Sequence, residues 1–91
     1  MLSEKEQAIV EGGLQAEALL DNPTFVTIMQ GLSLQCFEAF IASIPPDSLG
    51  RENTYNLFRG LQAIEEELRG RISAKDEITR RLDDALDDDQ D

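Results

Sequence analysis

The side chains of this sequence that could take part in chemistry are almost all carboxylates. The chain has 19 Asp and Glu, 8 Lys and Arg, one Cys, and neither His nor Trp. The usual general base near neutral pH and the usual nitrogen ligand of metals are therefore missing, so a Ser-His-Asp or Cys-His arrangement cannot form within one chain. Cys36 lies in an apolar run, where core packing is favoured over a reactive thiol. We expect a protein that is not an enzyme, with no catalytic residue, metal or cofactor.

Six Asp and no basic residue occupy residues 83–91. Asp87, Asp89 and Asp91 alternate like the first ligands of a calcium loop, but the glycine and the closing glutamate of such a loop are absent. A solvated, disordered tail over 87–91 is the simpler interpretation, and docking on a basic partner surface is the alternative. Candidate partner-binding residues here are Asp83, Asp84, Asp87, Asp88 and Asp89.

Two other charged groups lie between residues 51 and 81. Glu65, Glu66 and Glu67 would form a carboxylate site only if a second helix or subunit added ligands. The bases of this region are interspersed with acids, so solvated helix surface with pairs such as Glu65 with Arg69 explains them. Because the net charge of −11 repels phosphate backbones and anionic lipids, we expect neither nucleic acid nor a membrane as a direct partner.

Length and charge distribution predict one small domain with acidic ends. The 91 residues can bury only a thin core. Residues 1–50 carry a net charge of −6, residues 51–82 carry +1 and residues 83–91 carry −6. The start of the chain lacks the basic and apolar regions of a signal peptide, and we expect no stretch that approaches the roughly 20 apolar residues that span a bilayer.

The first helix is expected to begin at a capping box formed by Ser3 and Glu6. Gly12 and Gly13 interrupt its apolar face, and two glycines disfavour a helix interior. Either the helix bends there or another backbone comes close. We therefore separate an N-terminal helical arm, residues 1–12, from a helical core domain over residues 13–72.

The second helix is expected to start at Asn22 and Pro23 and to run to about Ser43. Between Asn22 and Pro46 its only charged residue is Glu38. A helix that is apolar almost all round needs covering, in a protein this small by a second copy or a partner. The candidate partner-binding residues of this helix are Phe25, Met29, Phe37 and Phe40, for which ordinary core packing is the alternative.

A third helix is expected from Asp47 or Ser48 to at least Leu68, after the Pro45-Pro46 break. A cap pattern at Ser73 and a weak point at Gly70 predict a short amphipathic helix over 73–86, which either docks on the core or continues the third helix. The predicted fold class is all-α, a three-helix bundle or helical hairpin with a short C-terminal helix and an acidic tail.

A loose pattern over about residues 15–70 resembles small, mostly uncharacterised helical proteins encoded by tailed bacteriophages. Its elements are Leu19-Leu20-Asp21-Asn22-Pro23-Thr24-Phe25, Phe37-Glu38-Ala39-Phe40, Ser43, Asp47, Arg51-Glu52, Leu61-Gln62-Ala63-Ile64 and Leu68. The resemblance implies a phage origin and a role in virion structure or assembly, and it transfers no catalytic residue.

The leading hypothesis is therefore a non-enzymatic protein-interaction module, a virion structural or assembly component that binds a protein partner or itself as a homo-oligomer. We expect it in the host cytoplasm during assembly or in the virion, and not secreted by a signal peptide. The alternative is an acidic DNA-mimic inhibitor of a host nucleic-acid-binding protein, which the net charge of −11 permits.

Overall fold

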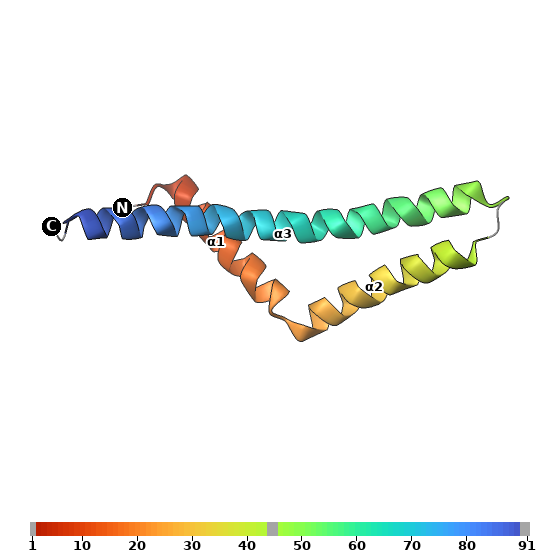
Figure 1. Cartoon of the computed structure of the whole chain (residues 1–91). Coiled ribbons are helices and arrows are strands. Elements are labelled where there is room, and N and C mark those ends of the chain that lie inside the picture. Colours follow the sequence, from red (N-terminus) through yellow and green to blue (C-terminus); the bar gives the residue numbers. More distant parts are fainter. Residues whose placement is uncertain (1, 44–45, 90–91) are drawn as a thin grey trace. The chain divides into compact units, whose positions relative to one another are not determined.

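Three α-helices make up the protein in the computed structural model, which describes residues 2–43 and 46–89, with side chains to residue 86. They are α1 (Glu4–Leu20), α2 (Pro23–Ala42) and α3 (Ser48–Asp89), as Figure 1 shows. No strand occurs in these described ranges. The all-α class predicted from the sequence is confirmed, whereas the bundle or hairpin arrangement stays a prediction.

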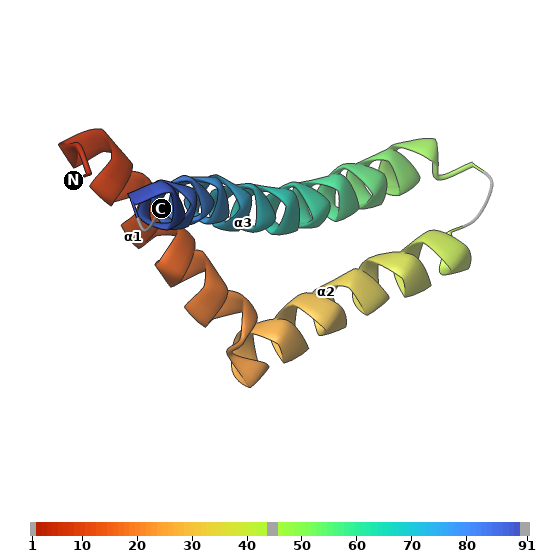
Figure 2. The same cartoon turned by 60° about the vertical axis from the view of Figure 1, so that its left-hand side comes forward.

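The helices contribute to two compact units, which we describe separately. The terminal unit consists of Met1–Asp21 and Glu67–Asp91, and the central unit is Asn22–Glu66. The terminal unit thus holds α1 and the second half of α3, and the central unit holds α2 and the first half of α3. Figure 2 shows the same three helices from a second direction.

Helix α1 begins at the predicted capping box. The Ser3 hydroxyl accepts a hydrogen bond from the Glu6 amide at 3.1 Å, and the Ser3 amide donates one to the Glu6 carboxylate at 3.2 Å. The helix then passes through Gly12 and Gly13 without a break. The predicted boundary after residue 12 is therefore not a helix end. Of the two explanations for the glycine pair, close approach of another backbone is the one observed, because Gly13 lies against α3.

Helix α2 starts where the sequence predicts. The Asn22 side-chain oxygen accepts hydrogen bonds from the amides of Thr24 at 2.9 Å and Phe25 at 3.1 Å, and Pro23 is the first helical residue. The helix ends at Ala42, where the Ser43 hydroxyl donates to the Phe40 carbonyl oxygen at 2.7 Å. Both predicted ends are confirmed.

Helix α3 is longer than predicted. The Asp47 carboxylate accepts a hydrogen bond from the Gly50 amide at 3.0 Å and so caps the helix, which continues for 42 residues. Of the two alternatives for residues 73–86, continuation of the third helix is the one observed, and the segment is not a separate helix. Gly70 costs only about 1 kcal/mol inside a helix, and the three-to-four-residue rhythm of less exposed positions continues through Leu68, Ile72, Lys75 and Ile78.

The sequence predicted a disordered tail over residues 87–91. Helix α3 extends to Asp89, so the predicted start of the tail at residue 87 lies too early in the chain. Residues 90 and 91 lie outside the described residues.

Candidate protein-interaction surface

The core of the central unit is small. Met29 and Cys36, seven residues apart on one side of α2, are buried against Leu61 of α3, and Phe25 and Phe58 pack against this cluster partly buried. No described side chain of the protein is less than 2% exposed. Two helices in contact thus cover one line of each other and leave the remaining apolar surface in water.

Much of the central unit's surface is apolar. Helix α2 has 20 residues, of which only Met29 and Cys36 are buried. The exposed large apolar side chains of the central unit are Ile28, Leu32, Leu34, Phe37, Phe40, Ile41, Leu49, Tyr55, Leu57 and Ile64. Scattered exposed apolar residues are normal in soluble proteins, but a contiguous set of this kind marks an interaction site.

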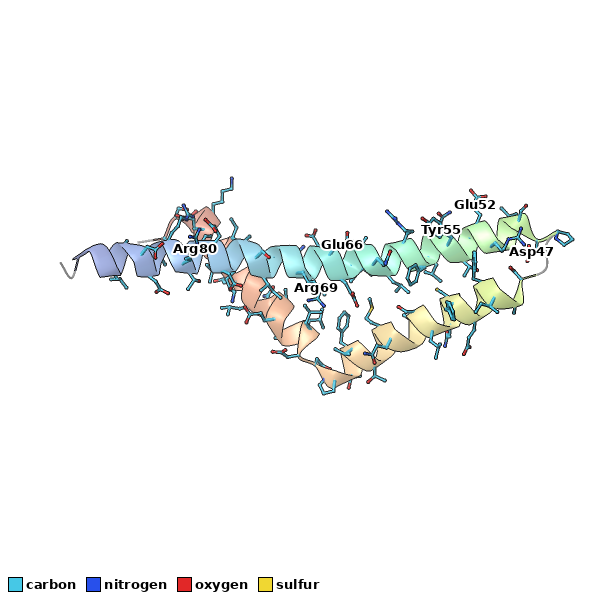
Figure 3. The ribbon with its side chains drawn as sticks, in the orientation of Figure 1. Asp47, Glu52, Tyr55, Glu66, Arg69 and Arg80 are labelled. Carbon is cyan, nitrogen blue, oxygen red and sulfur yellow. The ribbon has the colours of Figure 1, made fainter. Side chains whose placement is uncertain are left out.

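An apolar pocket shows which of these side chains lie together. It has a volume of about 260 Å³ and is lined from both helices. Its lining residues are Cys36, Phe37, Phe40, Thr54, Tyr55 and Phe58. Figure 3 labels Tyr55 on the first half of α3. The pocket is the size of one or two side chains and offers them aromatic walls.

Exposed apolar side chains continue from Phe37 around α2, toward the side that is turned away from α3. Leu34, Phe37 and Ile41 are spaced by three and four residues, which places them along one line of a helix. They are 56%, 60% and 65% exposed. We call the surface formed by Leu34, Phe37, Phe40, Ile41 and Tyr55, with the pocket between them, the apolar face.

A second group of aliphatic side chains lies on the other flank of the buried line. At about 100° per residue, Phe37 is turned to one side of Cys36, and Ile28 and Leu32 are turned to the opposite side. On α3, Tyr55 is turned to one side of Leu61, and Leu57 and Ile64 are turned to the opposite side. This flank has no aromatic residue, and none of its members lines the pocket.

The predicted partner-binding residues of α2 divide into two sets. Phe37 and Phe40 are exposed on the apolar face, whereas Met29 is buried and Phe25 packs partly buried against it. Leu34, Ile41 and Tyr55 were not among the candidate partner-binding residues predicted from the sequence. The available signal was the second line of apolar residues on α2, which repeats at helical spacing beside the first.

The predicted acidic candidates lie in the other unit. Asp83 and Asp84 are exposed on α3, and the side chains of Asp87, Asp88 and Asp89 lie outside the described ones. The structure therefore does not bring the predicted aromatic and acidic residues into one compact unit.

Ion pairs link the helices of the terminal unit. Lys75 on α3 pairs with Glu17 on α1, and Arg81 pairs with Glu6 at 3.3 Å. Along α3, Arg80 pairs with Glu77 at 2.7 Å. The described residues also include a pair between Arg71 and Glu67, but not the expected one between Glu65 and Arg69.

The titratable groups with shifted pKa values are structural. Hydrogen bonds from the amide and hydroxyl of Ser3 lower the pKa of the Glu6 carboxyl, with a smaller contribution from Arg81. A hydrogen bond from Arg80 lowers the pKa of Glu77 and raises that of Arg80. Glu6 lies in the first turn of α1, and Glu77 and Arg80 form an exposed ion pair on α3. None of these three residues lines the apolar pocket.

No group of three or more His, Cys, Asp or Glu within the described part of the chain could hold a metal ion. The terminal unit has an open hollow of about 450 Å³, lined mainly by small residues with Lys5, Glu67 and Arg71 at its edge. It contains no buried polar group that would orient a ligand. The apolar face is therefore the surface with the clearest capacity for binding.

By length and composition, α2 meets the criterion for a membrane span. Pro23–Ala42 has 20 residues and a mean hydropathy of 1.4 over its most apolar window. The expectation that no segment approaches the length and apolar content of a membrane span is therefore wrong. Glu38 is the only charged residue of this helix, and the surrounding apolar residues keep its mean hydropathy high. The core helix of a soluble protein can pass the same test, so composition alone does not choose between them.

Comparison of the chain with known protein families, characterised proteins and solved structures finds no match. The resemblance to small phage proteins gains no support from these comparisons.

Proposed function

We propose that this protein is a non-enzymatic protein-interaction module that packs the apolar face of its central unit against a protein partner. One observation carries the proposal. The helix with the highest apolar content leaves Phe37 and Ile41 60% and 65% exposed, while the whole cluster beneath it contains only three buried residues.

The exposed side chains offer enough free energy for binding. Transfer of apolar area from water yields about 25 cal/mol per Å², so covering the rest of a half-exposed Leu, Ile or Phe contributes roughly 1 kcal/mol or more. The five side chains of the apolar face then provide several kcal/mol. Aromatic walls around a pocket are also typical of interface residues that contribute most to affinity.

The chemistry of this face suits packing better than catalysis. Its polar groups are the hydroxyls of Thr54 and Tyr55, and Cys36 at the pocket is only 5% exposed. None of them stands beside a general base within the pocket. A hydrophobic or aromatic side chain of another protein fits such a lining.

The resemblance to small phage proteins supports a narrower form of the proposal, a structural or assembly component of a virion. The helical-hairpin form of the central unit belongs to the same proposal, since a hairpin presents one broad face formed by two helices.

Leu34→Glu and Leu86→Glu provide a matched test. The two leucines are 56% and 60% exposed, and each substitution adds one negative charge, but Leu86 lies in the terminal unit. Tagged full-length chains would be recovered from cells that make the protein naturally, and bound proteins quantified by mass spectrometry. A specific partner, this chain included, should be recovered with the wild type and with Leu86→Glu and be lost with Leu34→Glu. Recovery of the same proteins with all three chains would refute the proposal.

A further inference from the structure

Resting on the proposed function, we infer that the occupant of the apolar face is a second copy of this chain, so that two central units complete a four-helix bundle. Each copy contributes α2 and the first half of α3. The pocket around Cys36 is then closed by apolar side chains of the other copy.

The core of the central unit is incomplete. Met29, Cys36 and Leu61 are the only buried members of the core cluster in the central unit. Helical segments of this size do not fold stably alone without oligomerisation, a metal or a disulfide. The single Cys36 is a free cysteine, so no disulfide links the segments. A second copy is a partner that is present whenever the chain is made.

Helix α2 carries two lines of apolar side chains. In a four-helix bundle each helix packs on two neighbours and therefore needs a broad apolar surface made of two adjacent lines. Met29 and Cys36 form the line that contacts α3. Leu34, Phe37 and Ile41 form a second line, which is turned by about 100–160° from Cys36. This line has no neighbour within the described residues of the chain and would contact the second copy, with Phe37 nearest to the pocket.

The exposed apolar area of the central unit matches the apolar area of a protein interface. At roughly half exposure an aromatic side chain still presents on the order of 100 Å², and Leu34 and Ile41 present similar amounts. The five side chains of the apolar face thus offer about 500 Å² of apolar area. A specific interface of standard size buries about 800 Å² per partner, and homodimer interfaces are about 65% apolar. The apolar face supplies the apolar share of such an interface.

The central unit carries less net charge than the terminal unit. The central unit contains five acidic and two basic residues, a net charge of −3, whereas the terminal unit contains fourteen acidic and six basic residues, a net charge of −8. Two copies that associate through their central units meet where mutual repulsion is weakest. Helix α2 itself contributes only Glu38.

Sedimentation equilibrium of the purified full-length chain tests the inference. We expect a mass of twice 10.2 kDa for the wild type and for Leu86→Glu at micromolar concentrations. Leu34→Glu should weaken dimerisation about 100-fold or more, because two carboxylates would be buried in each dimer. A wild-type chain that stays monomeric up to millimolar concentration overturns the inference. A dimer that persists in Leu34→Glu but is lost in Leu57→Glu also overturns the inference, because the interface would then lie on the other flank.

Because folding and association are coupled, Leu34→Glu could also unfold the central unit. The wild-type melting temperature, followed by circular dichroism, gives a second readout. It should rise with protein concentration, since each folded dimer forms from two unfolded chains. A melting temperature that is independent of concentration overturns the inference.

Failure of this inference is distinguishable from failure of the proposed function. A monomer that does not float with neutral phosphatidylcholine vesicles, but loses a heterologous partner on Leu34→Glu, overturns the second-copy occupant and leaves the interaction module standing. A monomer that floats with these vesicles, and no longer does so after Leu34→Glu, overturns both the second-copy occupant and the proposed function. In that case the apolar face binds lipid.

Discussion

Gly13 of α1 lies directly against Lys75 of α3 within the terminal unit. A Cβ atom at residue 13 would collide with the Lys75 side chain and would come within 2.9 Å of the Arg71 carbonyl oxygen. Ala16 and Ile78, which are 2% and 5% exposed, are the buried residues of the same unit. Gly12, one residue away, has no such neighbour within 4 Å. The close contact of the two helices therefore requires glycine at one of the two positions.

Gly13→Ala should destabilise the protein by about 1–3 kcal/mol, because a backbone oxygen cannot move aside as a flexible side chain can. Gly12→Ala is the matched control. It should stabilise the protein by up to about 1 kcal/mol, since alanine favours a helix interior over glycine. Urea unfolding of the two variants measures both effects. Equal effects of the two substitutions would contradict the observed helix contact.

Ser3→Ala should remove the capping box of α1. We expect a loss of about 1 kcal/mol at neutral pH, as for other N-caps. The pKa of Glu6 should rise only part of the way toward its ordinary value, because the substitution removes the Ser3 hydroxyl but keeps the Ser3 amide, whose hydrogen bond lowers this pKa most. Carboxyl chemical shifts followed by NMR against pH measure this pKa. Glu77, whose pKa is lowered by Arg80, should titrate unchanged and serves as the internal control.

The sign of the pH dependence follows from the direction of the Glu6 shift. A carboxyl with a lowered pKa in the folded protein contributes stability above its unfolded pKa, and this contribution disappears as the pH falls through the folded pKa. The difference in stability between the wild type and Ser3→Ala should therefore be largest near neutral pH and narrow in acid. A difference that widens in acid would show that the box does not act through the Glu6 carboxylate.

Truncation after Leu82 should leave thermal stability unchanged or raise it. The buried residue Ile78 and Arg81, which pairs with Glu6 of α1, both precede the cut and are retained. The deletion removes six Asp and changes the net charge from −11 to −5. Carboxylates near a helix C-terminus oppose the helix dipole, so their removal relieves an unfavourable interaction.

Differential scanning calorimetry measures the effect of this truncation, and full-length Asp83→Asn/Asp84→Asn separates charge from length. A clearly lower melting temperature for the truncated chain would show that residues 83–91 contribute packing. The same truncation addresses the DNA-mimic alternative, which requires the carboxylates of the tail if its activity resides there.

Added salt should strengthen self-association. Each copy carries a net charge of −11, and salt screens the repulsion between copies while leaving apolar packing intact. The dissociation constant from sedimentation should therefore fall as sodium chloride is raised from low to physiological concentration. Weaker association at higher salt would indicate that opposite charges, and not the apolar face, hold the copies together.

Local signals in the sequence predicted the beginnings of the helices well. Capping by Ser3, Asn22 and Asp47 depends on side chains that bond to amides two or three residues away, so a short segment contains all the necessary information. At Gly12-Gly13 and before Ser73 the sequence left two alternatives open, and the helices continue through both positions because the cost of a glycine inside a helix is small beside tertiary packing.

The candidate site was predictable only in part. The excess of apolar residues on α2 was visible in the sequence, and Phe37 and Phe40 are exposed as a binding role requires. Which apolar line faces α3 was not visible, because Met29 and Phe37 are equally apolar and lie on neighbouring lines. That choice depends on where Leu61 of α3 packs, a contact between residues far apart in the chain.

Tyr55 allows the central claim to be measured without any label. It is the only Tyr in a chain without Trp, it lies on the apolar face, and it is 53% exposed in the single copy. Quenching of its fluorescence by acrylamide, a neutral quencher, reports how far that face is covered. We predict strong protection at micromolar concentrations in the wild type and in Leu86→Glu, and loss of protection in Leu34→Glu. Quenching of wild-type Tyr55 that stays at the level of a half-exposed tyrosine at every concentration would contradict an apolar face covered by a second copy.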